Sequence, residues 1–594
     1  MKTVFPKRRV LIYLALFGSA VGFLFIVQYS GNSGNDLKGN NVVIPRDALV
    51  RNAMDEIQEV RPRVNDVIAQ NEDFVDEKEE KKESLEVIDD LVVKKKESEN
   101  RIEKDYGYED KKADVKEKKT PLPEESEGIK EVIQPPNDED ARKREKIREM
   151  MKFAWEGYKN YSWGANELSP IAKIPHTQSI FGGSSMAATI VDAADTLFIM
   201  GLTKEYEDAK KFIEESWSIK KATGQLSVFE TTIRFIGGFL TLFGLTGEEI
   251  YKKRAQETAD VLLPAFDTST GIAKSLITPG SKSATNYNWA RDESILAEFG
   301  SLHLEFEYLT QITGNKIYLQ KVQKIRDFLE KAEKPNGLYP TYLNPNTGKF
   351  GNNHVSLGAL GDSFYEYLIK SYLLTNKTDD QALRMHVAAS NAIQEHMVFT
   401  SKSGLKYVAE LRGNNPEHKM GHLACFCPGM FALESQNEKN EERKKKLMQL
   451  AEDLANTCHE SYNRSESKIG PEMFYFNDRD DATSLRSENG YILRPEVLEG
   501  FFYLWRLTGN QKYKDWVWEG ISAMDKHCRT GAGFAGLKNV YNPSQGFDDT
   551  QQSFFLAETL KYAYLTFDND AIPLEKYVFN TEAHPFPIYQ PTVI

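Results

Sequence analysis

Three stretches of the chain share one frame: FLTLFGLTGEEIY at 239–251, FEYLTQITGNKIY at 306–318 and FYLWRLTGNQKY at 502–513. Each is an aromatic-rich helical pattern that ends in Thr-Gly, and a Tyr follows that Gly by four residues. Glycine is favoured just after a helix because it adopts the left-handed conformation that ends the helix. The frame therefore predicts a unit of two helices joined by a tight turn, repeated along the chain.

A fourth, degenerate copy is IKSYLLTNKTDD at 369–380, with Asn376 at the position of the glycine. Asparagine is the second choice there. Amphipathic helical patterns continue from about residue 145 to the end, without strand–helix alternation, a G-x-G-x-x-G or a P-loop. An all-α domain of repeated hairpins is expected over 145–594, closed into a ring or extended as a solenoid.

The N-terminus has the pattern of a membrane anchor. Residues 1–9 carry four basic side chains and no acid, and residues 10–29 carry no charge. About 20 apolar residues span a bilayer as a helix, and the basic flank keeps the N-terminus cytosolic. We therefore expect a cytosolic tail over 1–9 and a transmembrane signal-anchor over 10–29, with the remainder lumenal. A cleaved signal peptide is the alternative.

Residues 30–144 are highly charged and poor in aromatic side chains, so they are expected to form a lumenal stem, disordered or partly helical, rather than a packed domain. The net charge of −13 argues against nucleic-acid binding, which needs a basic surface. Four cysteines, at 425, 427, 458 and 528, lack the spacing of a zinc site. In a lumenal compartment one disulfide is expected, and three glycosylation sequons agree with that compartment.

Carboxylates recur upstream of the turns. Glu230 lies seventeen residues before Gly247, Glu496 thirteen before Gly509, and Asp362 fourteen before Asn376. Such acids stabilise the first turn of a helix, so helix capping is one explanation. Glu298 and Glu558 occupy similar aromatic contexts, and Glu366 and Glu499 also lie among apolar residues. If the helices run the same way in a ring, the acids converge at one end, where they could transfer protons, bind a hard cation or hold sugar hydroxyls.

At these residues the chain resembles a known family, the class I α-1,2-mannosidases of glycoside hydrolase family 47, over about 150–588. The matching motifs, in order, are MKFAWEGYKNYSWGANELSPI, ATIVDAADTLFIMGL, VFETTIRFIGGFL, ILAEFGSLHLEF, GLYPTYLNPNTGKFG, LGDSFYEYLIK, MGHLACF, ILRPEVLEGFFYLWRLTG, QQSFFLAETLKY and FNTEAHPFPI. The resemblance implies an (αα)7 barrel, plugged at one end by a hairpin. It also implies an inverting reaction that removes terminal α-1,2-linked mannose from high-mannose N-glycans, which needs an acid, a base and a water between them.

The resemblance also assigns roles by motif. It implies that Glu230 is a general acid acting through a water, that Glu496 is the general base, and that Asp362 is a third essential acid; the sequence alone does not divide acid from base. Positions that would contact the sugar or its ordered water are Arg234, Arg494, Glu499, Phe554, Glu558 and Glu582. His422 matches a position near the sugar, with a packing histidine as the alternative.

The family's calcium site is implied at Thr581, in FNTEAHPFPI, through its backbone carbonyl and its hydroxyl. Ca²⁺ takes six to eight oxygens, so waters and sugar hydroxyls would complete the shell. The resemblance pairs Cys425 with Cys458 and leaves the state of Cys427 and Cys528 open. Leu360, two residues before Asp362, resembles the Golgi subgroup that trims several mannoses, whereas the narrow enzyme of the endoplasmic reticulum carries Arg there.

The resemblance thus implies a calcium-dependent glycosidase of the Golgi membrane, with single-pass type II topology. Two rival functions remain. One is a glycan-binding paralogue of glycoprotein quality control with little or no turnover, although Glu230, Asp362 and Glu496 are all present. The other is a helical-repeat scaffold in which the acids only cap helices.

Overall fold

The structure is a computed structural model that describes residues 139–176, 181 and 185–591. The expected tail at 1–9, the anchor at 10–29 and nearly all of the stem at 30–144 lie outside the described residues.

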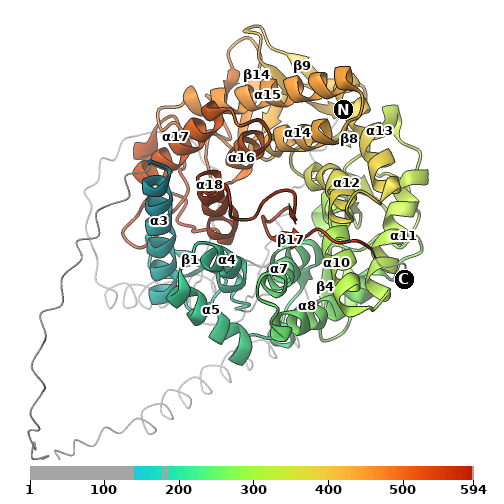
Figure 1. The fold of residues 1–594 in the computed structure, drawn as a ribbon. Helices are drawn as coiled ribbons and strands as arrows, with labels where there is room; N and C mark the ends of the chain where they lie inside the picture. The colour runs from blue at the N-terminus through green and yellow to red at the C-terminus, as the bar shows by residue number, and fades with distance from the viewer. Residues whose placement is uncertain (1–138, 177–180, 182–184, 592–594) are drawn as a thin grey trace, which may run out of the picture. The chain divides into compact units, whose positions relative to one another are not determined.

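The described residues form two concentric rings of helices (Figure 1). Seven outer helices are described: α3 (Glu139–Ser162), α5 (Thr203–Glu215), α8 (Glu249–Leu262), α11 (Ile317–Lys331), α13 (Asp380–His396), α15 (Glu441–Asn463) and α17 (Gln511–His527). They alternate along the chain with inner helices, in the described part α4 (Ala188–Ile199), α7 (Gly237–Thr246), α10 (His303–Thr313), α12 (Asp362–Leu374), α14 (Cys427–Asn437), α16 (Glu496–Thr508) and α18 (Leu560–Thr566).

The ring closes through its inner helices. Each inner helix contacts the next one along the chain, and the π-helical turn η8 (Phe555–Thr559) that leads into α18 contacts α4. A similar lead-in, α6 (Val228–Glu230) and η2 (Thr231–Ile236), precedes α7. The expectation of a helical barrel is confirmed, and closure rather than a solenoid is what the tertiary structure adds.

The repeated Thr-Gly frame forms the turns between inner and outer helices. Gly247, Gly314 and Gly509 follow α7, α10 and α16 with φ of 72°, 72° and 67°, the left-handed conformation that ends a helix. Asn376 takes φ of 49° after α12, as its place in the degenerate copy predicts. All four turns therefore lie at the same end of the barrel, the end where inner helices finish.

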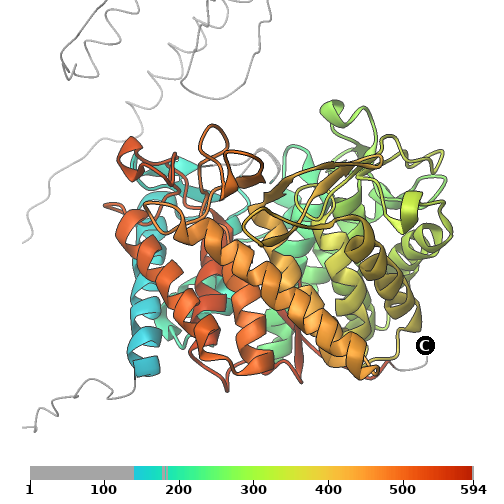
Figure 2. The same cartoon turned by 90° about the horizontal axis from the view of Figure 1, so that it is seen from above.

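The opposite end carries short strands of two to four residues. Three of them lead directly into inner segments: β3 (Leu226–Ser227), β6 (Ser294–Ile295) and β13 (Lys419–Gly421). Figure 2 shows strands and loops gathered at this end of the ring. The all-α expectation omitted these strands because each is too short to carry a periodic pattern of its own.

A C-terminal hairpin, β16 (Tyr577–Phe579) and β17 (Pro585–Pro587), runs inside the ring (Figure 1). Its β17 strand follows α7: the Thr241 hydroxyl donates to the Pro585 carbonyl, and Asn580 donates to the Ile233 carbonyl at 2.9 Å. Gly237 is required at this approach, because a Cβ there would lie 2.6 Å from the Asn580 amide nitrogen. The hairpin therefore runs along α7 from its Gly247 end toward Glu230, so that its turn lies on the side of Glu230.

Within the described residues, one helix has the length and hydropathy of a membrane span, Val228–Thr246, with a mean hydropathy of 1.4. It is the inner segment α6–η2–α7, and 72% of its window is buried inside the barrel. Its apolar character is explained by packing against neighbours on every side. It is a separate segment from the anchor expected at 10–29.

The expected start of the barrel at residue 145 falls inside α3, which runs from Glu139. The first turn of α3 packs against α17, where Lys514 pairs with Asp140 and the Lys143 ammonium lies 5.6 Å from the Trp518 ring centroid. The sequence prediction placed these charged residues in the stem because of their composition. Their burial depends on contacts with residues about 370 positions further along the chain.

Candidate active site

Three of the predicted acids begin inner segments at the strand-bearing end of the barrel. Glu230 ends α6, and Asp362 and Glu496 are the first residues of α12 and α16. All three are partly exposed, whereas the residues that follow them in each helix are mostly buried. The Ser227 hydroxyl accepts a hydrogen bond from the Glu230 amide at 3.2 Å, so it starts that helix. Carboxylates from three separate segments therefore border one opening of the ring.

Glu496 is held as a carboxylate. His422 Nδ1 lies 2.8 Å from Glu496 Oε2, and His422 Nε2 lies 2.7 Å from the Tyr462 hydroxyl. Burial would raise the pKa of Glu496, but the hydrogen bond and charge of His422 and the charge of Arg494 outweigh burial and lower the pKa. His422 therefore contacts the predicted general base directly, and its place near the sugar stays a prediction.

Asp362 has the opposite tendency. Burial raises its pKa to about 7, with a further contribution from the negative charges of Glu496 and Glu366. Arg494 opposes the rise, but its guanidinium is engaged by Glu472, with 2.7 Å between Nε and Oε2. The pKa values of these two neighbouring carboxyl groups move apart. Asp362 is therefore suited to holding a proton, and Glu496 is suited to accepting one.

Arg234 connects Glu230 to the barrel floor. Its Nε donates to Glu230 Oε2 at 2.8 Å, and its Nη1 contacts both Glu582 and Asp192. The guanidinium also lies 5.8 Å from the Phe554 ring centroid, so Phe554 and Glu582 share one side of the site. The structure brings these predicted site residues together and adds Asp192, which the sequence analysis did not single out; their contacts with a sugar stay a prediction.

Glu499 lies in the first turn of α16 and belongs to a buried group of polar side chains. Lys370 pairs with Glu366 and lies 3.8 Å from Glu499 Oε1, and the Tyr562 hydroxyl donates to Glu499 at 3.4 Å. Burial and the charge of Glu366 together raise the pKa of Glu499 well above its ordinary value.

Thr581 occupies the turn of the C-terminal hairpin, one residue before Glu582. Its amide donates to the Tyr367 hydroxyl at 3.4 Å. Among the described residues, no donor is directed at the carbonyl or hydroxyl oxygen of Thr581. Both oxygens, the pair the sequence prediction assigned to the metal, are thus available for a ligand.

The carboxylates around this turn favour a cation. Burial, followed by the charges of Glu496 and Glu499, raises the pKa of Glu558 well above its ordinary value. Burial likewise raises the pKa of Glu582, with Asp192 and Glu558 adding to it against Arg234. Oxygen donors beside excess buried negative charge fit a hard divalent ion such as Ca²⁺.

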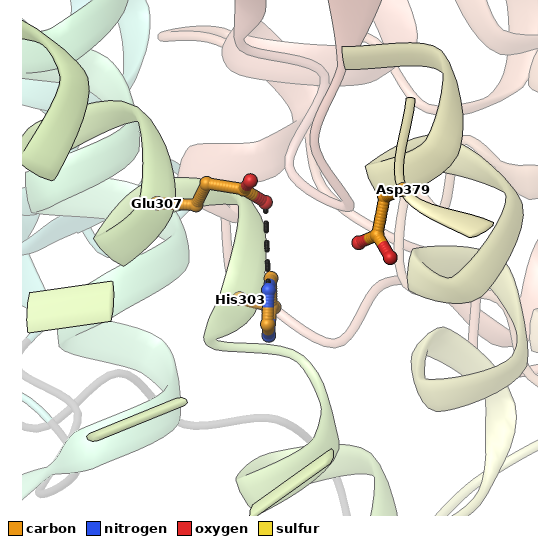
Figure 3. Close-up of side chains that lie close together, drawn as sticks. All are labelled: His303, Glu307 and Asp379. Atoms are coloured by element: carbon orange, nitrogen blue, oxygen red, sulfur yellow. Dashed lines mark ion pairs between the residues drawn. The ribbon is translucent and has the colours of Figure 1, made fainter. Parts of the chain in front are cut away.

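A different group of residues has ligand atoms at metal-like spacing in the described part of the chain. His303 and Glu307 of α10 and Asp379 before α13 lie within 4.8 Å of one another (Figure 3). Asp379, however, already pairs with Arg326 and accepts the Ala382 amide as the helix cap. Asp379 is thus already engaged by an ion pair with α11 and by the cap of α13, so we assign no metal ion to this group.

The sequence prediction missed a buried network beneath the site. Lys561 Nζ lies 2.6 Å from Asp195 Oδ2, and the two ring nitrogens of His584 lie 3.0 Å from Asp195 and 3.3 Å from Asp192. Lys561 also donates to the Ala583 carbonyl at 2.7 Å. The network fastens the hairpin next to Thr581. Its only sequence signal is a pair of aspartates in the otherwise apolar run ATIVDAADTLFIMGL.

Two further predictions concern covalent and loop structure. The Cys425–Cys458 disulfide is present and joins the segment that carries His422 to α15, whereas Cys427 and Cys528 are buried free thiols. Leu360 has a φ of 77°, and its carbonyl accepts the Ala297 amide at 3.0 Å. Leu360 therefore lies in the loop that leads to Asp362, at the rim of the opening.

Comparisons with known proteins agree with this geometry. The model of glycosyl hydrolase family 47 matches residues 150–588. Mannosyl-oligosaccharide 1,2-alpha-mannosidase mans-2 of Caenorhabditis elegans is 60% identical over 471 residues, covering 78% of this chain and 80% of that protein. Mannosyl-oligosaccharide 1,2-alpha-mannosidase IB of Mus musculus is 50% identical over 457 residues, covering 76% and 71%.

Among solved structures, the alpha-1,2-mannosidase from Trichoderma reesei superposes with a TM-score of 0.69 at 27% identity, covering 75% of this chain and 99% of that one. The match of the family model over most of the chain, the relatives at 50% identity or more and the shared barrel agree with one another. The chain belongs to glycosyl hydrolase family 47.

Proposed function

We propose that the protein is an inverting exo-α-1,2-mannosidase that removes terminal α-1,2-linked mannose from high-mannose N-glycans. The observation that carries this proposal is the pair Glu496 and Asp362, which begin separate inner helices with pKa values moved in opposite directions. The names of the relatives, mannosyl-oligosaccharide 1,2-alpha-mannosidases, support the same substrate class.

Glu496 acts as the general base. It stays ionised because His422 and Arg494 favour its charged form, so it can take a proton from the attacking water. Attack by water on the face opposite the leaving sugar inverts the anomeric centre. In inverting enzymes the two carboxyl groups stand about 6.5–9.5 Å apart to admit that water.

The proton for the leaving oxygen comes from the other side of the opening. Asp362, with a pKa of about 7, holds a proton near neutral pH and is one source. Glu230, oriented by Arg234, is the second, acting through a water. An assay with α-mannosyl fluoride distinguishes the two candidate acids, because its leaving group needs no protonation. A variant that lacks the true acid keeps its activity on this substrate.

The remaining residues hold the terminal mannose. Arg234 lies over Phe554, which offers an apolar surface to the sugar ring at the floor of the site. Glu499, Glu558 and Glu582 offer acceptors for sugar hydroxyls and ordered water, and Arg494 lies beside the base.

Thr581, through its carbonyl and hydroxyl oxygens, would hold a Ca²⁺ ion, with waters kept by Glu496, Glu558 and Glu582. When bound, the ion orients sugar hydroxyls and offsets the buried negative charge. The chain itself positions Thr581, because the Lys561–Asp195–His584 network fixes the hairpin next to it.

We further propose a Golgi membrane location with type II topology. The uncharged segment 10–29 after a basic tail supports this, since it has the length of one membrane span.

One experiment tests the activity. The protein is incubated with a high-mannose glycan, with and without a calcium chelator, and the products are weighed by mass spectrometry while NMR follows the released sugar. Loss of mannose units, β-mannose as the first product and inhibition by the chelator are expected. Absence of mannose release by calcium-loaded protein would refute the proposal, and α-mannose as the first product would refute inversion.

A further inference from the structure

Tyr462 connects an outer helix to the proposed general base. It lies in the last turn of α15, with 4% of its surface accessible. Its hydroxyl lies 2.7 Å from Nε2 of His422, whose Nδ1 lies 2.8 Å from Oε2 of Glu496. Two hydrogen bonds in series therefore lead from the outer ring of helices to the carboxylate.

The carboxylate sets the direction of these bonds. An ionised carboxylate only accepts hydrogen bonds, so Nδ1 of His422 carries a proton and donates to Glu496. In the neutral imidazole Nε2 is then an acceptor, and the Tyr462 hydroxyl donates to it. Burial, followed by the negative charge of Glu496, raises the pKa of Tyr462 well above its ordinary value, so the hydroxyl keeps its proton.

Close packing holds Tyr462 in place. A Cβ on Gly470 would lie 2.5 Å from the tyrosine ring, so the backbone at this glycine lies directly against the ring. The amide and the hydroxyl of Ser465 both donate to the Tyr462 carbonyl, at 3.2 and 3.0 Å. The phenol is thus a fixed point from which the imidazole can be oriented.

The disulfide joins the two segments that carry this pair. Cys425 follows His422 by three residues, and Cys458 precedes Tyr462 by about one turn of α15. Their Cα atoms are 6.1 Å apart. Movement of the His422 segment relative to α15 is therefore restricted next to the hydrogen bond.

Tyr491 packs against the imidazole as well, with 5.7 Å between the ring centroids. Its hydroxyl donates to the Arg494 carbonyl at 2.9 Å, so its proton is not directed at His422. Among the described hydrogen bonds, Tyr462 is the one partner of His422 Nε2.

We propose that Tyr462 is a positioning residue for the hydrolysis, acting through His422 to hold the Glu496 carboxylate toward the attacking water. The inference rests on the proposed function and deepens it. Without the hydroxyl the imidazole is held at one end only, and it can rotate away from the carboxylate. A displacement of about 1 Å in a catalytic group is enough to slow a reaction substantially.

A double-mutant cycle on the calcium-loaded full chain tests the proposal, with release of mannose from a high-mannose glycan as the assay. Tyr462→Phe removes one oxygen atom and keeps the ring that packs on Gly470. It is expected to lower kcat about tenfold and to change KM by less than about twofold. In a His422→Ala background it should cause no further loss, because the residue through which Tyr462 acts is gone.

The pH dependence of kcat/KM gives a second measurement. Besides His422 and Tyr462, the titratable and charged groups that act on Glu496 are Arg494, Asp362, Glu499, Glu558 and Tyr491. Tyr462→Phe leaves these groups in place and weakens the hold of His422, which favours the ionised carboxylate. The acidic limb of the profile is therefore expected to move to higher pH, by about half a unit.

Tyr407→Phe is the matched control. The Tyr407 hydroxyl lies 2.7 Å from Nδ1 of His418, so a hydrogen bond of the same kind and length is removed. Tyr407 is buried on β10 (Lys406–Val408), and in the described structure His418 is hydrogen-bonded to none of the predicted acids. Its kcat and its pH profile should match those of the wild type.

An unchanged kcat in Tyr462→Phe would overturn the inference. Equal losses in the two backgrounds, a loss confined to KM or an acidic limb that does not move would overturn it too, since Tyr462 would then not act through His422 on the base. These outcomes concern Tyr462 alone and require an active wild type. If the wild type releases no mannose, the proposed function itself fails.

Discussion

Replacement of Asp362 by Asn should stabilise the protein while it removes activity. The pKa of Asp362 is raised from 3.8 to about 7 in the fold, so the folded state binds a proton that the unfolded chain releases. The free energy of unfolding therefore falls as pH rises from about 4 to about 7. Asn has nearly the same shape and carries no charge, so the variant escapes this loss.

The size of the effect follows from the shift. A change of about three units at about 1.4 kcal/mol per unit sets an upper limit of about 4 kcal/mol. Asp362 is partly exposed, so solvent reduces the value, and we expect about 2–4 kcal/mol at pH above about 7. For a domain of about 450 residues, with an unfolding entropy equivalent to about 1 kcal/mol per degree, this raises the unfolding temperature by about 2–4 °C.

Scanning calorimetry of calcium-loaded wild type and Asp362→Asn, at one scan rate and at about pH 4 and about pH 8, measures this difference. The gain should appear at the higher pH and be small at the lower one, where the folded carboxyl is protonated and the unfolded one is about half protonated. The exposed Asp515 provides a control for the removal of one surface carboxylate, through Asp515→Asn. An equal gain at both pH values, or a less stable variant at the higher pH, would refute the reasoning.

Three further predictions follow from the site. Leu360→Arg should narrow the set of mannoses removed from a high-mannose glycan, because a long charged side chain at the rim admits fewer branches; an unchanged product profile contradicts this. Thr581→Val should weaken calcium binding in isothermal titration by about tenfold or more, since it removes one of two proposed oxygen ligands, and equal affinity would exclude the hydroxyl. Lys561→Met should lower the free energy of unfolding by about 3–5 kcal/mol because it leaves Asp195 buried without its cation, and a loss below about 1 kcal/mol in thermal unfolding would show that His584 suffices.

Much of the site was accessible from the sequence because its residues belong to repeated units. Glu230, Asp362 and Glu496 each stand a fixed number of turns before a helix-ending Gly or Asn, so equivalent positions were expected to share one end of the barrel. Thr581 and Leu360 were predicted as site residues from the resemblance to the family, because the helical periodicity does not identify them. The first turn of α3 and the short strands were missed because their signals lie in distant partners or in two to four residues.

The pairing of charges in the buried network could not be predicted from the sequence. Asp192 and Asp195 sit in an apolar helix, and Lys561 and His584 lie about 370–390 residues further on. Nothing in their local patterns pairs them, because the partner of a buried charge is chosen by the closure of the ring. The tertiary structure places Lys561 2.6 Å from Asp195 and so fixes the hairpin that carries Thr581.

The sequence by itself determined the helical hairpin, its repetition, the turn residues and the placement of carboxylates at helix starts, since these depend on contacts within one repeat. The resemblance to the family implied a closed barrel with a hairpin at one end, whereas the tertiary structure supplied the contacts that close the ring and decided that Glu496 and Asp362 differ in pKa. The difference arises because a pKa depends on burial and on charges brought near through space: His422 and Arg494 beside Glu496, and Glu366 and Glu496 beside Asp362.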